Sequence, residues 1–140
     1  WRSRIGCPEV SAEIVCQGPS SSIVHLTWKA AARFDLMPGS RWVYICVENI
    51  TAVQWHPVSI VQVGDHVHVL VKGLGDWSCS LCALIASEAL LRIKTEGPFG
   101  RPLCKNDSYS RALLLVAGGV GIAPFADLLC NMPQDWRRHK

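Results

Sequence analysis

Residues 113–125 read Leu-Leu-Leu-Val-Ala-Gly-Gly-Val-Gly-Ile-Ala-Pro-Phe, a short apolar run that stops at glycines and then meets a proline. This order predicts a buried strand over Ala112–Ala117, a tight turn, and a helix from Ala123 to about Asn131. Glycines let the turn approach a bound anion, and the free N–H groups of a helix start attract phosphate. The stretch therefore predicts a phosphate site in one strand–turn–helix unit of a parallel α/β domain.

The length of the chain leaves little room for the rest of such a domain. Only 16 of the 140 residues follow Pro124, whereas a nucleotide-binding sheet needs several strands. The chain also begins at Trp1 rather than at a methionine. We therefore expect one complete domain over residues 1–107 and the truncated start of a nucleotide-binding domain over residues 108–140, with the polar stretch Arg101–Arg111 at the boundary.

Composition excludes several classes of protein. Fourteen basic and eleven acidic side chains give a net charge of +3, and the basic residues are scattered, which argues against nucleic-acid binding. Seven cysteines are an odd number at irregular spacing, so we expect mostly free thiols in a reducing compartment. The apolar stretch Ala112–Ala126 is shorter than the ~18–20 residues of a membrane-spanning helix, and no signal peptide is visible.

The first hundred residues have the pattern of a small β domain. Short apolar runs alternate with turn residues, and His66–Lys72 alternates with a period of two, as a strand with one wet face does. One helical stretch, Cys79–Ala89, interrupts them. The pattern predicts a mainly β fold, a six-stranded antiparallel Greek-key barrel, with strands at Ala12–Cys16, Ile23–Trp28, Trp42–Val47, Val58–Val63, His66–Leu74 and Leu91–Thr95.

The motif His56-Pro57-Val58-Ser59 leads directly into a strand. Proline fixes its own φ and restricts His56 to extended geometry, so a stiff backbone presents the Ser59 hydroxyl. Such an edge can hold a flat heterocycle by polar contacts. The alternative interpretation is that the motif only begins a strand.

Two further motifs follow. In Lys72-Gly-Leu-Gly-Asp-Trp-Ser78, the lysine can pair with a phosphate, and Ser78 with a helix N-terminus can hold the rest of a pyrophosphate. The alternative is that Ser78 merely caps the helix after a glycine turn. Gly97-Pro98-Phe99-Gly100 predicts a sharp turn with an aromatic side chain at its tip.

Taken in order, these motifs resemble the ferredoxin–NADP reductase superfamily. The resemblance is narrower to the dehydrogenase region of ferric-chelate reductases and NADPH oxidases, where the flavin motif is His-Pro-Phe-Ser/Thr and a later segment reads Gly-Asp-Trp-Thr. Five motifs agree in register over nearly the whole chain, from Pro38-Gly39 to Pro124-Phe125.

The resemblance implies a role for each matched position. One group borders the flavin of FAD, a second lies at its pyrophosphate, Gly97–Gly100 links the two domains, and a glycine turn holds the phosphates of the nicotinamide nucleotide. The cofactor-binding residues implied are His56, Pro57, Val58 and Ser59 at the flavin, Lys72, Trp77 and Ser78 at the pyrophosphate, Gly97 at the link, and Gly119, Gly121 and Pro124 at the turn.

Three departures from the family pattern bear on binding. Val58 stands where the family usually has phenylalanine, which removes an aromatic contact beside the flavin. Lys72 stands where arginine is usual, which replaces a guanidinium group that can donate two parallel hydrogen bonds with a single ammonium group. Both changes weaken the expected FAD site, and the family's later nucleotide-binding strands are absent.

The function implied is that of a flavoprotein oxidoreductase fragment. In the parent protein NADPH passes a hydride to FAD, and electrons go on to haem and then to ferric iron or oxygen. The partners implied are the nicotinamide nucleotide and a haem-bearing membrane domain of the parent chain, with this segment on the cytoplasmic side. Because the cofactor carries the chemistry, we expect no catalytic acid or base here, and the fragment alone is expected to be inactive.

Two other functions stay open at this point: a soluble ferredoxin-reductase-like flavoprotein, and a small β-barrel binding module without enzymatic activity. The choice between NADPH and NADH, the electron acceptor and the oligomeric state are not fixed by the residues.

We expect no metal site. Cys79-Ser-Leu-Cys82 has no second pair and no nearby histidine, so a partly buried helix is the favoured interpretation over zinc. His66 and His68 share one strand face with no carboxylate at metal-ligand spacing, which predicts exposed strand residues.

Overall fold

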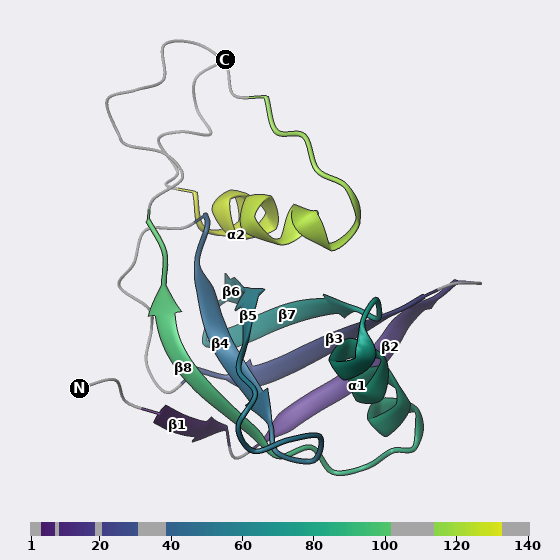
Figure 1. The fold of residues 1–140 in the computed structure, drawn as a ribbon. Helices are drawn as coiled ribbons and strands as arrows, with labels where there is room; N and C mark the ends of the chain where they lie inside the picture. The colour runs from purple at the N-terminus through teal and green to yellow at the C-terminus, as the bar shows by residue number, and fades with distance from the viewer. Residues whose placement is uncertain (1–3, 8, 19–20, 31–38, 102–113, 133–140) are drawn as a thin grey trace.

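A computed structural model describes residues 4–7, 9–18, 21–30, 39–101 and 114–132. Their strands form two four-stranded antiparallel sheets (Figure 1). The first sheet has the order β1 (Arg4–Cys7), β8 (Ile93–Phe99), β4 (Trp42–Val47), β5 (His56–Ser59). The second has the order β2 (Val10–Gln17), β3 (Ser22–Lys29), β7 (His66–Lys72), β6 (Val61–Val63).

The mainly β, antiparallel class predicted from the sequence is confirmed, with differences in detail. The described strands form two sheets rather than one closed ring, and β1 was not predicted. The predicted strand Val58–Val63 is divided at Ile60 into β5 and β6, which belong to different sheets. Ile60 is fully buried and its N–H donates to the Arg41 carbonyl at 3.0 Å, so the chain turns there from one sheet to the other.

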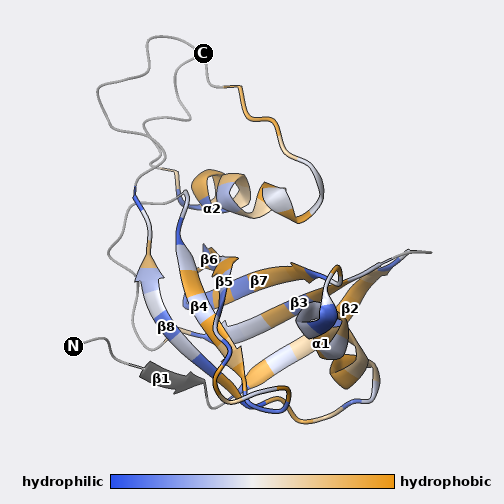
Figure 2. Cartoon of the chain, in the orientation of Figure 1, coloured by the Kyte–Doolittle hydropathy of each residue, from blue (hydrophilic) through white to orange (hydrophobic). Residues whose placement is uncertain are grey.

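The hydrophobic core lies between the sheets and under the first helix. Along β3, buried and half-buried side chains alternate. The same alternation along β7 gives that strand one face that is accessible to solvent, as its sequence predicted. Figure 2 shows this alternation as orange and blue bands along the strands. The buried core side chains are Val24, Leu26, Trp28, Val43, Ile45, Val47, Ile60, Val67, Val69, Val71, Leu81, Ile85, Leu91 and Ile93.

Helix α1 (Asp76–Ala86) begins and ends three residues before the predicted range Cys79–Ala89. Gly75 is its N-cap in extended geometry, with φ of −127°. Ser78 is therefore the third residue of the helix. The interpretation of Ser78 as the N-cap is wrong. Its hydroxyl reaches back and accepts the Gly75 N–H at 3.0 Å, which satisfies a donor at the helix start.

The C-terminal segment matches one prediction and contradicts another. Helix α2 (Ala123–Asn131) has the predicted bounds and follows the short 3₁₀ turn η1 (Gly119–Ile122). Of the predicted strand Ala112–Ala117, residues 112 and 113 lie outside the described residues, and residues 114–117 form no strand. No described strand pairs with this stretch, so its backbone lacks the hydrogen-bonded neighbour that a β-strand needs. Leu114 is 87% exposed. It appears as an arc outside the sheets (Figures 1 and 2).

Candidate functional site

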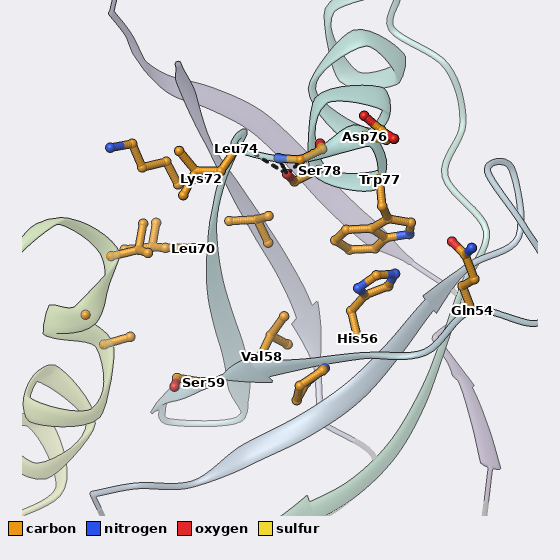
Figure 3. Close-up of a pocket in the computed structure, with 16 residues that line it drawn as sticks. Gln54, His56, Val58, Ser59, Leu70, Lys72, Leu74, Asp76, Trp77 and Ser78 are labelled. Carbon is orange, nitrogen blue, oxygen red and sulfur yellow. Dashed lines mark hydrogen bonds between the residues drawn. The ribbon is translucent and has the colours of Figure 1, made fainter. Parts of the chain in front are cut away.

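A cavity of about 730 Å³ lies where β5, β7, the start of α1 and the η1 turn meet. The strands contribute one wall, since β5 and β7 are neighbours across the two sheets, and α2 brings the η1 turn to another. Figure 3 shows the side chains that line it. They are Gln54, His56, Pro57, Val58, Ser59, Leu70, Val71, Lys72, Leu74, Gly75, Asp76, Trp77, Ser78, Val120, Gly121 and Ala123.

Eight of the eleven predicted cofactor-binding residues therefore surround one cavity, although β5 and α1 are separated by the whole of β6 and β7. The eight are His56, Pro57, Val58, Ser59, Lys72, Trp77, Ser78 and Gly121. Gly119 and Pro124 flank the turn that contributes Gly121 but do not line the cavity. Gly97 lies on β8 and does not line the cavity; a Cβ added there would contact Val43 and Phe99.

The rings of His56 and Trp77 stack in the wall of the cavity. Their centroids are 3.9 Å apart and their planes differ by 22°. His56 Nε2 and Trp77 Nε1 are buried, and neither has a hydrogen-bond partner within the described part of the chain. A buried polar atom without a partner is costly, so two of them at one wall indicate a site that a polar ligand completes.

Burial also sets the charge of His56. Removal from water disfavours the imidazolium and lowers the pKa of His56 below its usual value near 6.5. At neutral pH the ring is therefore uncharged and presents one N–H donor and one lone pair. An uncharged donor and acceptor of this kind can hydrogen-bond the polar edge of a heterocycle, but it adds no positive charge to attract a phosphate.

The charged groups of the cavity are Lys72 and Asp76. Lys72 ends β7, and among the described residues its ammonium group forms no ion pair. Asp76 is in the first turn of α1, where its carboxylate interacts favourably with the helix dipole. Lys72 is therefore the cation that an anionic ligand in the cavity could meet, whereas the Asp76 carboxylate opposes such a ligand.

Ser78 already has partners in the protein. Its Oγ accepts the Leu74 N–H at 2.9 Å and the Gly75 N–H at 3.0 Å, and it can donate to the Gly75 carbonyl at 3.0 Å. The hydroxyl thus fixes the turn between β7 and α1, which carries Lys72 at one end and Trp77 at the other. A direct contact of Ser78 with a pyrophosphate stays a prediction.

The η1 turn has the geometry that its glycines predicted. Gly119 has φ of +55°, a left-handed conformation that favours glycine. The Gly121 N–H donates to the Gly118 carbonyl at 3.1 Å, which closes the turn. Pro124 occupies the first turn of α2, where a proline needs no hydrogen bond. Val120, Gly121 and Ala123 then border the cavity opposite β5 and β7.

A buried carboxylate that the sequence analysis did not single out holds this turn in place. Asp127 on α2 is fully buried and forms an ion pair with Arg41, which is itself 3% exposed. Arg41 Nε lies 2.7 Å from Asp127 Oδ2, and Arg41 Nη2 bonds the other oxygen. The Gly39 N–H donates to Oδ2 at 2.8 Å and the Gln62 N–H to Oδ1 at 3.0 Å. Each carboxylate oxygen thus accepts two of these hydrogen bonds.

Asn131 extends the same network one helical turn along. Its amide donates to the Gln62 carbonyl at 2.8 Å and to Asp127 Oδ1 at 3.2 Å. Arg41 also donates to the Gln62 side chain at 2.9 Å. α2 is therefore fixed to β6 and to the residue before β4. No local signal predicted this, because the partners of Asp127 come from distant parts of the sequence.

The remaining reactive side chains lie outside the cavity. Cys79 is exposed, and burial, followed by the neighbouring Cys79, raises the pKa of the Cys82 thiol. Five cysteines in the described residues are free thiols. Within the same residues no cluster of three or more histidine, cysteine or acidic side chains is placed to hold a metal ion. None of the described helices has the length and apolar character of a membrane span.

Comparison with known proteins gives one family and a consistent set of relatives. The family model for an FAD-binding domain matches residues 8–103. The chain is 32% identical to ferric reduction oxidase 4 of Arabidopsis thaliana over 133 residues, which cover 91% of this chain and 18% of that protein. It is 29% identical to NADPH oxidase 3 of Rattus norvegicus over 139 residues, which cover 92% of this chain and 23% of that protein. The chain thus spans less than a quarter of the length of these relatives.

Proposed function

Because this chain belongs to the family of FAD-binding domains that its residues 8–103 match, we propose that the cavity between β5, β7 and α1 is the FAD site of a flavoprotein oxidoreductase. The observation that carries the proposal is the convergence of His56, Ser59, Lys72 and Trp77 on one cavity. The unpartnered His56 Nε2 and Trp77 Nε1 fit a ligand with polar edges.

The residues divide between the two ends of the dinucleotide. His56, Val58 and Ser59 lie on β5 and form the flavin end, where the Ser59 hydroxyl can hydrogen-bond a ring nitrogen. Lys72 and the first turn of α1 at Asp76 and Trp77 lie at the pyrophosphate end, where an ammonium group and the N–H groups of a helix start favour an anion. Trp77 joins the two ends because it lies in the first turn of α1 and stacks on His56.

FAD supplies the redox chemistry when bound, since it accepts a hydride and releases electrons. The protein positions it. The stacked His56–Trp77 pair excludes water from one side, Ser59 fixes the edge, and Lys72 neutralises phosphate charge. Gly121 in the η1 turn brings backbone to the opposite side, where a nicotinamide nucleotide would have to approach.

The wider activity is proposed on the relatives' names. We infer that the full-length protein takes electrons from NADPH and delivers them to ferric iron or oxygen, as the names ferric reduction oxidase and NADPH oxidase suggest for its relatives. We further propose a haem-bearing membrane part in the full-length protein and a cytoplasmic position for this domain. The division into residues 1–107 and 108–140 is also a proposal, and the Asp127 network shows that α2 is tied closely to the sheets.

Titration of the purified chain with FAD tests the site. Binding is followed by quenching of flavin fluorescence, with Lys72→Gln as the variant and Lys29→Gln as its control, because Lys29 pairs with Asp65 away from the cavity. We expect saturable binding that weakens about five-fold or more in Lys72→Gln and is unchanged in Lys29→Gln. Failure of the wild-type chain to bind FAD, or equal weakening by both variants, would show that the cavity is not the FAD site.

A further inference from the structure

Two histidines distant in sequence meet on the outer face of the second sheet. On β3, Val24, Leu26 and Trp28 point into the core, so His25 and Thr27 point to the opposite face. β7 runs antiparallel to β3, with Thr27 directly opposite His68. His68 therefore comes to the same outer face beside His25, 43 residues away in sequence.

Three side-chain atoms on this face form a nearly equilateral triangle. His25 Nε2 lies 3.0 Å from His68 Nδ1 and 3.0 Å from Thr27 Oγ1, and Thr27 Oγ1 lies 3.3 Å from His68 Nδ1. The planes of the two imidazole rings differ by 11°. The two ring nitrogens and the hydroxyl oxygen thus lie within hydrogen-bond distance of one another on one patch of the surface.

Glu13 determines which nitrogen of His25 is free to accept. It lies directly opposite His25 on β2, and its carboxylate is 3.0 Å from His25 Nδ1. An ionised carboxylate only accepts hydrogen bonds, so His25 Nδ1 donates and the neutral ring has its lone pair on Nε2. This is the arrangement in which a carboxylate orients a histidine that binds a metal through its other nitrogen.

We propose that His25 Nε2, His68 Nδ1 and Thr27 Oγ1 bind a divalent late first-row transition metal ion on the outer face of the β2–β3–β7 sheet, with Glu13 orienting His25. With metal–ligand distances of about 2.0–2.1 Å, neighbouring ligands lie about 3.0 Å apart on an octahedral face and about 3.3 Å apart in a tetrahedron. The triangle observed here spans this range. The ring centroids are 5.2 Å apart, so the two nitrogens face each other almost directly, as in a hydrogen bond. Both rings must turn away from this line for their lone pairs to meet on the ion in place of the shared proton.

The chemistry of the ligands selects the class of ion. Two imidazoles favour Ni²⁺, Cu²⁺ and Zn²⁺ over Mg²⁺ or Ca²⁺, which prefer oxygen. Solvent reaches the three ligands because none of them is fully buried, so water can fill the remaining coordination positions. The site lies on the face of the sheet opposite the core. None of its three ligands lines the FAD cavity, but His25 lies directly opposite Leu70, which does.

Isothermal titration of the 140-residue chain with Ni²⁺, which does not oxidise thiols as Cu²⁺ does, tests the proposal. The variants are His25→Asn, His68→Asn, Thr27→Val and Glu13→Gln. His66→Asn is the matched control, because His66 is on the same face of the same strand but pairs with Asp65 at 2.7 Å. We expect each ligand histidine to account for a ten-fold or greater loss of affinity, Glu13→Gln for about ten-fold, and His66→Asn for none.

Nitrogen-detected NMR of the histidine rings with Zn²⁺ identifies the bonded atoms. Zn²⁺ is expected to move the signals of His25 Nε2 and His68 Nδ1, which separates this site from binding to the free thiols. Circular dichroism of each metal-free variant checks its fold. Unchanged affinity in folded His25→Asn and His68→Asn, an equal loss in His66→Asn, or shifts confined to other histidines would overturn the proposal.

Discussion

The Arg41 guanidinium and the Asp127 carboxylate, 86 residues apart in sequence, form a two-bond ion pair with almost no solvent exposure. The pair connects α2 to the residue that precedes β4. Because α2 follows directly on the η1 turn, the position of Gly121 at the cavity depends on this buried pair.

Asp127→Asn is expected to destabilise the chain by about 3–5 kcal/mol, because it removes the negative charge that is paired with the buried Arg41 guanidinium. Urea unfolding measures the change. The control is Asp65→Asn, whose carboxylate is 58% exposed and pairs with Lys29 at the surface, and which is expected to change stability little. Equal midpoints for wild type and Asp127→Asn would contradict the structural role of the pair.

The stability of the chain is expected to fall when the pH is lowered from about 7.5 to about 5.5. Burial lowers the pKa of His56, and burial together with the neighbouring His25 and His66 lowers the pKa of His68. As the pH falls, the unfolded chain therefore binds protons first, near pH 6.5. Stability is greatest above that pH and is lost as the pH falls from there through the lower pKa values of the folded chain. Denaturant midpoints at the two pH values measure this.

His56→Gln provides the comparison for the pH effect. Its amide keeps polar character in the cavity wall but does not titrate, so the fall in stability between the two pH values is expected to be smaller than in the wild type. A fall of the same size in both proteins would assign the pH dependence to other groups.

Lys72→Arg is expected to tighten FAD binding about five-fold, equivalent to about 1 kcal/mol. A guanidinium can donate two parallel hydrogen bonds to a phosphate, whereas an ammonium makes one directed contact. Fluorescence titration with FAD measures the affinity. If the arginine variant binds no better than the wild type, Lys72 does not contact the pyrophosphate.

Ser59→Ala is expected to leave the fold intact, to slow photoreduction of bound flavin, and to shift its potential by about 10–30 mV. Loss of one hydrogen bond of ordinary strength accounts for a change of this size in a two-electron couple. Spectroelectrochemical titration of the FAD-loaded chain measures it. An identical potential and spectrum would mean that His56-Pro57-Val58-Ser59 only begins β5.

Gly100→Ala is expected to cost more than ~2 kcal/mol of stability, because φ is +132° there and an added Cβ would lie 2.3 Å from the Ser40 carbonyl oxygen. Gly75→Ala is the control: an added Cβ meets nothing within 4 Å, and φ is −127°. Thermal unfolding compares the two. Similar melting temperatures would show that the turn at Gly100 is more adaptable than the structure indicates.

Local patterns predicted the parts of the molecule that local interactions determine. The alternation in His66–Lys72 located a half-buried strand, and Pro124 after a glycine turn located the start of α2 to the residue. The motifs around His56 and Lys72 also converge on one cavity, as their resemblance to a flavin family implied.

Features that depend on distant partners could not be predicted in this way. The Leu114–Ala117 run is apolar enough for a strand, but a strand also needs a neighbour to bond, and no described strand supplies one. From its sequence neighbours alone, Asp127 is an ordinary polar residue on an amphipathic helix. Only the fold brings Arg41 and Gln62 beside it. The sequence likewise predicts His68 as an exposed strand residue, whereas the β3–β7 register places it half-buried beside His25.

The long sequence separation of Arg41 and Asp127 affects how the chain matures on the ribosome. At about 5–20 residues per second, Arg41 is synthesised roughly 4–17 s before Asp127 exists. During that interval the nascent sheets contain a cation whose principal counter-ion has not been made. The N-terminal strands and the last helix therefore complete one cooperative folding unit, and a nascent chain halted before α2 emerges is expected to be the species that chaperones and proteases recognise.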